Sequence, residues 1–122
     1  MTPEQIVRAF CDAAARRDVE ELGGYFTEDA VYHNIPVAPV NGRAEIEATL
    51  GQFIGPASSV AFEMLAIASS GNVVLTERID RFVLGGKSIA IPVMGTFELT
   101  AEGKIKAWRD YFDMQQFMSQ MG

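Results

Sequence analysis

The chain has 122 residues, of which 48% are hydrophobic and 21% charged; this is the composition of one globular domain over residues 1–122. Its 16 acidic and 10 basic side chains give a net charge of −6, which argues against nucleic acid or an anionic membrane surface as a partner. No apolar run could span a bilayer, the N-terminus lacks a signal pattern, and the single Cys11 excludes an intrachain disulfide. We therefore expect a cytoplasmic protein.

The first part of the chain carries the patterns of three helices. Residues 2–5, Thr-Pro-Glu-Gln, form a capping box with proline at the first helical position, and apolar residues then recur at helical spacing through residues 6–14. A short second helix is predicted after Asp18 and ends at the glycine pair 23–24. A third is predicted over residues 42–53. Cys11 lies on the apolar stripe of the first helix and is interpreted as a core residue.

A short strand is predicted over residues 30–36, between the second and third helices. Tyr32 and Asn34 point to the same face of this strand, because alternate residues share a side. Two interpretations stay open: a polar pair with a shared task, or a core tyrosine followed by a turn-forming asparagine before Pro36. His33 is the only histidine, so neither a multi-histidine metal site nor a histidine-based triad is expected.

From residue 58 onward the pattern changes to long strands. Strands are predicted over residues 60–68, 73–84, 88–99 and 104–111, separated by turn-forming residues, and a last short helix begins after Asp113. Pro92 inside the third of these strands predicts an edge or a bulge. Helices followed by an antiparallel meander predict an α+β fold, with the helices on one face of the sheet.

Two strands place charged residues on apolar faces. Asp110 lies between Trp108 and Phe112 on one side of its strand, where a carboxylate must be paired, hydrogen-bonded or protonated. The alternative is an edge strand whose aspartate points to water.

The second stretch is Thr-Glu-Arg-Ile-Asp at residues 76–80. Arg78 and Asp80 share a face with Val74 and Phe82. They form either a salt bridge on a solvated face or, if Asp110 lies in the same sheet, an Asp-Arg-Asp group in which one guanidinium holds two carboxylates. Two acids in different surroundings can differ in pKa, so that one donates a proton while the other accepts one.

Four stretches together resemble the limonene-1,2-epoxide hydrolase family: VYHNIP, TERID, FELTAEGKI and WRDYFD. The resemblance extends over nearly the whole chain. It implies the cone-shaped α+β fold of nuclear transport factor 2, in which a curved mixed or antiparallel sheet carries the N-terminal helices on its concave face. The same fold hosts many unrelated functions, so the motifs carry the functional expectation.

The resemblance implies a role for each polar residue. Asp110 would be the general base, Asp80 the general acid and Arg78 the bridge that orients both, while Tyr32 and Asn34 would help Asp110 to hold a water molecule. The expected reaction is the addition of water to a small apolar epoxide, giving a vicinal diol, with no cofactor and no metal required. We expect an apolar substrate pocket built from Trp108, Phe112, Val74, Phe82, Leu65 and Met94.

Two other functions stay open at this point: an isomerase or cyclase of the ketosteroid isomerase or SnoaL type, and a non-catalytic module that binds a small ligand. An isomerase has no evident need for an arginine between two acids. The outer face of an open sheet needs a cover that the helices do not supply, so we also expect a homodimer formed through the sheet, as the resemblance implies.

Overall fold

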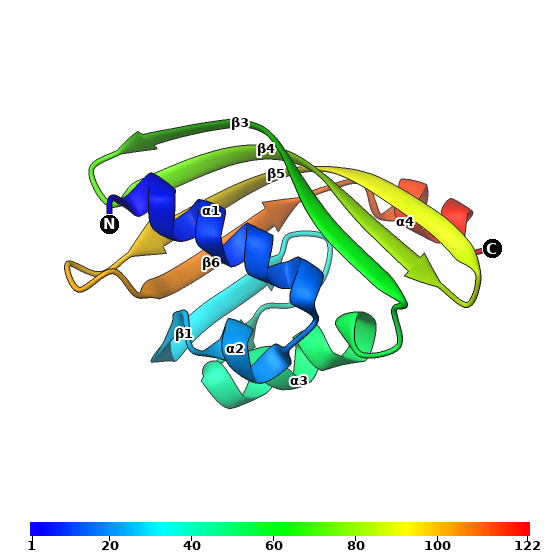
Figure 1. The fold of residues 1–122 in the computed structure, drawn as a ribbon, viewed down its shortest axis with the longest axis horizontal. Coiled ribbons are helices and arrows are strands. Elements are labelled where there is room, and N and C mark those ends of the chain that lie inside the picture. The colour runs from blue at the N-terminus through cyan, green and yellow to red at the C-terminus, as the bar shows by residue number, and fades with distance from the viewer.

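The computed structural model describes all residues from 1 to 122 (Figure 1). The helices are α1 (Pro3–Ala13), α2 (Val19–Gly23), α3 (Arg43–Ile54) and α4 (Met114–Met121), with a 3-10 turn, η1 (Ala14–Arg16), after α1. The strands are β1 (Phe26–Asn34), β2 (Val40–Asn41), β3 (Ser59–Ser70), β4 (Val73–Leu84), β5 (Lys87–Leu99) and β6 (Ile105–Tyr111). None of the helices has both the length and the apolar character needed to cross a bilayer.

One six-stranded sheet in the order β2-β1-β6-β5-β4-β3 organises the molecule. The last four strands form the predicted antiparallel meander, and β1 adds to β6 in parallel. The sheet is therefore mixed, and it curves around the N-terminal helices (Figure 1). The loop predicted at residues 36–42 contains the short strand β2, which pairs with β1. Strand β1 starts at Phe26, four residues before the predicted start.

Local sequence determines where the helices begin. Thr2 accepts a hydrogen bond from the backbone of Gln5, whose side chain accepts one from Thr2 in return, so the capping box is formed. Asp18 caps α2 and Asp113 caps α4 by accepting hydrogen bonds from backbone N–H groups of the first turn. The expected third helix begins one residue later, after Gly42, whose φ of 92° favours glycine.

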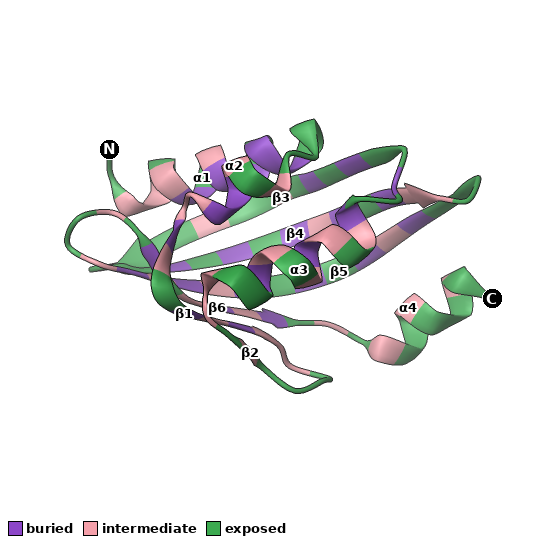
Figure 2. Cartoon of the chain, turned by 90° about the horizontal axis from the view of Figure 1, so that it is seen from below, coloured by how far each residue is buried: buried purple, intermediate pink, exposed green.

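The core lies between the concave face of the sheet and helices α1, α2 and α3. Buried residues alternate along β4 and β5 (Figure 2), as expected for strands with one covered face. Four aromatic rings meet Trp108 in this core: Phe10 edge-on, and Phe26, Tyr32 and Phe97 stacked. Asp110, which accepts a hydrogen bond from Trp108, thereby lies next to a densely packed aromatic layer.

Helix α4 lies apart from the other helices, against the end of β5 (Figure 2). Strand β6 pairs with β5 only from Met94 to Leu99, so Pro92 has a strand neighbour on one side alone. Pro92 therefore lies at a local edge, where its missing N–H costs no sheet hydrogen bond. Gln120 of α4 covers this edge: its amide exchanges hydrogen bonds of 2.8 and 2.9 Å with the backbone of Ala90.

Candidate active site

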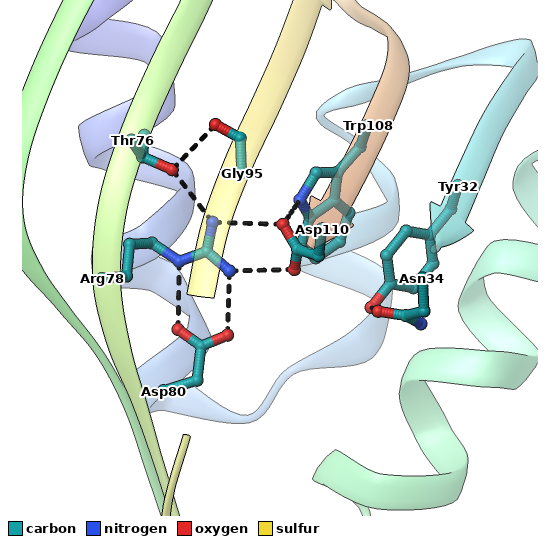
Figure 3. Close-up of polar contacts among 8 residues, drawn as sticks. All are labelled: Tyr32, Asn34, Thr76, Arg78, Asp80, Gly95, Trp108 and Asp110. Carbon is teal, nitrogen blue, oxygen red and sulfur yellow. Dashed lines mark hydrogen bonds and ion pairs between the residues drawn. The ribbon is translucent and has the colours of Figure 1, made fainter. Parts of the chain in front are cut away.

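Strand pairing brings the charged residues together on the concave face. Gly95 of β5 lies directly opposite Thr76 of β4 on one side and opposite Asp110 of β6 on the other. Opposed residues share a face, and glycine has no side chain to separate its neighbours. Arg78 therefore reaches across β5 to Asp110 while also binding Asp80 on its own strand (Figure 3).

The guanidinium of Arg78 is completely buried, and each of its five N–H groups has an acceptor. Nε and Nη2 donate to the two oxygens of Asp80 at 3.0 and 2.8 Å. Nη1 and Nη2 donate to the two oxygens of Asp110 at 3.2 and 2.8 Å, and Nη1 also donates to Thr76 at 3.1 Å. The interpretation as a solvated surface pair is therefore wrong, because all three charged groups lie inside the protein.

Burial and charge act on these groups in opposite directions. Burial raises the pKa of Asp80 from 3.8 to about 6, since desolvation and the neighbouring Asp110 outweigh the attraction of Arg78. Burial alone would lower the pKa of Arg78, but the charges of Asp110 and Asp80 raise it well above its usual value. The arginine thus stays charged, and Asp80 is suited to hold a proton near neutral pH.

Tyr32 and Asn34 lie beside Asp110 because β1 runs parallel to β6. Asn34 is the strand partner of Asp110, and Tyr32 is the partner of Trp108. The Tyr32 hydroxyl donates to Asn34 Oδ1 at 3.2 Å (Figure 3). Burial, followed by the charge of Asp110, raises the pKa of the Tyr32 phenol, which keeps it a neutral donor. Tyr32 and Asn34 thus line the same cavity as Asp80 and Asp110.

A cavity of about 200 Å³ opens beside the two carboxylates. Its polar residues are Asp80, Asp110, Tyr32 and Asn34, and the rest of its wall is apolar. The apolar wall consists of Val37, Phe53, Phe62, Phe82, Leu84, Ile91, Val93, Phe112, Met114 and Phe117. A small apolar molecule in this cavity would meet four polar groups in one place.

Four of the six predicted pocket residues do not line the cavity, whereas Phe82 and Phe112 do. Leu65 and Met94 are each 52% exposed on the outer face of the sheet. Met94 is opposite Tyr111, one step out of phase with Gly95 and Asp110, and Leu65 lies where the register of β3 shifts. Val74 and Trp108 are on the correct face but completely buried in the core.

Thr76 and Gly95 complete the group, although neither was predicted from the sequence as a site residue. Thr76 accepts from Arg78 and donates to the carbonyl oxygen of Gly95 at 3.1 Å. A Cβ on Gly95 would lie 2.6 Å from Asp110 Oδ1 and closer still to Arg78 Nη1, so no other residue fits there without displacing the group. The alternation that placed Arg78 inward also places Thr76 inward, and a glycine within a strand signals close approach.

Neither Cys11 nor His33 takes part in the polar group. Burial raises the pKa of the Cys11 thiol to about 12, which makes it a core residue and a poor nucleophile. The Nε2 atom of His33 lies 3.0 Å from the carbonyl oxygen of Val37 in an exposed loop contact.

The chain thus has an α+β fold, in which one curved mixed sheet holds two carboxylates and an arginine beside an apolar cavity. The family model for the limonene-1,2-epoxide hydrolase catalytic domain matches residues 1–122. The chain is 33% identical over 110 residues to epoxide hydrolase EphG of Mycobacterium tuberculosis, covering 88% of this chain and 71% of that protein. This chain belongs to the limonene-1,2-epoxide hydrolase family.

Solved structures agree with the predicted fold. A limonene-epoxide-hydrolase-like epoxide hydrolase of M. tuberculosis superposes with a TM-score of 0.80 and 29% identity, covering 97% of this chain and 87% of that one. A protein with a ketosteroid-isomerase-like fold from Catenulispora acidiphila superposes with a TM-score of 0.85 and 22% identity, covering 98% and 93%. The predicted fold class is confirmed, and epoxide hydrolysis is the activity supported at the level of the family.

Proposed function

We propose that the protein is a cofactor-independent epoxide hydrolase that adds water to an epoxide in one general acid–base step. The observation that carries this proposal is a completely buried Arg78 that donates four hydrogen bonds to two carboxylates, both of which also line an apolar cavity. A buried charge cluster of this kind is costly to maintain for stability alone. Its position at the wall of a cavity supports a catalytic use.

Asp110 is proposed as the general base. A carboxylate has about four acceptor positions, and three at Asp110 are filled by two bonds from Arg78 and one from Trp108. One position is left for a water molecule. Tyr32 and Asn34 lie beside it and can orient the same water, which brings the nucleophile into the reacting geometry before the chemical step.

Asp80 is proposed as the general acid. Its raised pKa of about 6 leaves a useful fraction protonated near neutral pH. In the step, the water oxygen forms a bond to one epoxide carbon while the bond between that carbon and the ring oxygen breaks. Asp110 takes a proton from the water, and Asp80 gives its proton to the ring oxygen. The product is a vicinal diol, and the site resets when a proton leaves Asp110 and another reaches Asp80.

The cavity wall supports a small apolar epoxide as substrate. Its aromatic residues from three different elements, Phe53, Phe82 and Phe117, surround the space next to the acids. Apolar surroundings strengthen the interactions of the two carboxylates with the reacting atoms, because they exclude water. The charged and strongly hydrated substrates of many other hydrolases would lose their hydration here without compensation.

A panel of cyclic and terminal epoxides tests the proposal, with diol formation as the readout. We expect turnover of at least one small apolar epoxide and none in the Asp110→Asn variant. An isomerase would instead transform an enone without consuming water, and a binding module would bind the panel without product. Diol formation at the same rate by the wild type and Asp110→Asn would contradict the proposal.

We also propose a homodimer formed through the outer face of the sheet. Each of the strands β3 to β6 places at least one large, half-exposed apolar side chain there, among them Leu65, Leu75, Met94 and Tyr111. Such a face on a small protein favours a partner, and a second copy offers the same strands about a two-fold axis.

Light scattering at micromolar concentration should give twice the monomer mass, and Met94→Glu should give a monomer. A monomeric wild type would contradict the proposal; Met118→Glu, on exposed α4, is the control.

A further inference from the structure

The two carboxylates bound to Arg78 do not receive the same hydrogen bonds. Asp80 accepts two, both from Arg78. Asp110 accepts two from Arg78 and a third, of 2.7 Å, from the indole Nε1–H of Trp108. Hydrogen bonds to a carboxylate favour its charged form. The indole is therefore the one donor that distinguishes two acids that otherwise share the same guanidinium (Figure 3).

The indole of Trp108 is a fixed donor. Its ring is completely buried and stacks on Tyr32, with ring centroids 4.0 Å apart and an interplanar angle of 12°. Phe97 stacks at 5.4 Å, and Phe10 meets the ring edge-on at 5.1 Å. An indole nitrogen can only donate, so this bond cannot reverse when the neighbouring carboxyl gains a proton. A proton on Asp110 Oδ1 would therefore lie against the hydrogen of the indole N–H, which is unfavourable.

The other side of the group is equally fixed. The hydroxyl of Thr76 accepts a hydrogen bond from the fifth N–H of Arg78 and donates one to the carbonyl oxygen of Gly95. The absence of a side chain at Gly95 lets Asp110 and Arg78 lie against the backbone of β5. The guanidinium therefore cannot slide toward one carboxylate to compensate for the difference that the indole makes.

We propose that Trp108 is a positioning residue whose N–H keeps Asp110 the charged member of the pair and so holds the shared proton on Asp80. The catalytic meaning of this inference rests on the proposed function, since it assigns the base and the acid before substrate arrives. The location of the proton is a property of the free protein. Without the indole N–H, each carboxylate would accept two bonds from one guanidinium, and the proton would be divided between them.

Few other groups can take part in this titration. The titratable residues around the pair are Arg78 on β4, Tyr32 on β1 and Cys11 on α1. The pKa of Arg78 and that of Tyr32 are raised, and the pKa of Cys11 is about 12. Asn34 does not titrate. The thiol, the phenol and the guanidinium therefore do not exchange a proton with the two carboxyl groups near neutral pH.

The chain has a single tryptophan, which permits a sharp test. Biosynthetic replacement of tryptophan by benzothienylalanine keeps the ring shape and puts sulfur in place of the N–H. Titration of protein labelled with ¹³C at the aspartate carboxyls reports the protonation of each acid without substrate. In the native protein we expect one step, at Asp80. In the benzothienyl protein and in Trp108→Phe we expect the Asp80 and Asp110 signals to titrate together, with a lower kcat and an unchanged KM.

Phe10→Leu is the control, because it removes a ring that packs edge-on against Trp108 without removing a hydrogen bond from Arg78 or from either carboxylate. It should keep the single step at Asp80. An unchanged titration in the benzothienyl protein would overturn the inference, even if the enzyme hydrolyses epoxides. If the native protein turns over no epoxide and the benzothienyl protein shows coupled titration of Asp80 and Asp110, the inference is upheld and the proposed function is refuted.

Discussion

The two faces of strand β4 are both mixed: polar residues lie inside between the apolar Val74 and Phe82, and an apolar residue is exposed outside beside the charged Glu77. Toward the helices it presents Thr76, Arg78 and Asp80, all buried, whereas toward the outside it presents Leu75, which is 49% exposed. A sheet built for stability alone would place these residues the other way round. Neighbouring residues of a strand point to opposite faces, so the register that buries the charged residues also exposes the leucine. The inner face supports the proposed reaction site, and the outer face supports the proposed homodimer.

The largest expected effect comes from neutralising either acid on the inner face. Asp110→Asn can no longer take a proton from water, and Asp80→Asn can no longer deliver one, so each should lower kcat by about 10²–10⁴-fold. Steady-state kinetics on an epoxide found in the panel would measure this loss. Asp12→Asn, on the exposed side of α1, is the matched control and should keep full activity. Full activity in either inner-face variant would refute its assignment.

Arg78→Lys should weaken both folding and activity. Lysine has three donors where Arg78 uses five, so at least one buried carboxylate oxygen would lose its partner. Breaking a buried ion pair costs about 3–5 kcal/mol in free energy of unfolding, which chemical denaturation can measure. Arg81→Lys is the control on the same strand, because Arg81 is half-exposed and pairs with Glu63 on the outside. The control should change the free energy of unfolding by less than about 0.5 kcal/mol.

The pH dependence of activity should follow Asp80. If Asp80 acts only when protonated, kcat/KM should fall about tenfold for each pH unit above its pKa of about 6. A pH profile that stays flat from 6 to 9 would exclude Asp80 as the acid.

Stability should change over the same pH range and with the same sign. The folded protein binds the Asp80 proton more tightly than the unfolded chain, whose carboxyl keeps a pKa near 3.8. The resulting stabilisation is complete below that value and is lost as the pH rises through about 6. Asp80→Asn should remove this component from the free energy of unfolding measured against pH.

The smallest effect is expected at His33. Its ring is within hydrogen-bonding distance of the carbonyl oxygen of Val37 and does not line the cavity, so His33→Ala should keep most of its turnover per folded molecule. A folded but inactive His33→Ala enzyme would mean that the base has been misassigned.

Local patterns in the sequence were enough for most of the fold and for the placement of the charged group. The capping box predicted the start of α1, and turn residues predicted the bounds of β4. Simple alternation placed Arg78 and Asp80 on one face of their strand and Asp110 beside Trp108 on its own strand, whereas their meeting across β5 was one of two open interpretations. The parallel pairing of β1 with β6 depends on contacts between distant segments, and no local pattern determines it.

The pocket wall was harder to predict, because a register error of one residue moves a side chain to the opposite face. Strand β3 shifts register between Met64 and Ala66, which leaves Leu65 outside. Met94 is excluded by the pairing of Gly95 with Asp110. The register of β5 against β6 also shifts between Glu98 and Leu99. The turn residues between these strands do not reveal such a shift. Helix α4 supplies Met114 and Phe117 to the cavity through tertiary packing.

The source of the new oxygen tests the one-step mechanism most directly. Some hydrolases form an ester between an enzyme carboxylate and the substrate, so that the first oxygen transferred comes from the enzyme. Here Asp110 is bound by Arg78 and Trp108 and is proposed to act on a water molecule. In a single turnover in ¹⁸O-water, with enzyme in excess over epoxide, the diol should carry the label. Unlabelled diol, with ¹⁸O entering Asp110 or Asp80 in later turnovers, would contradict the mechanism.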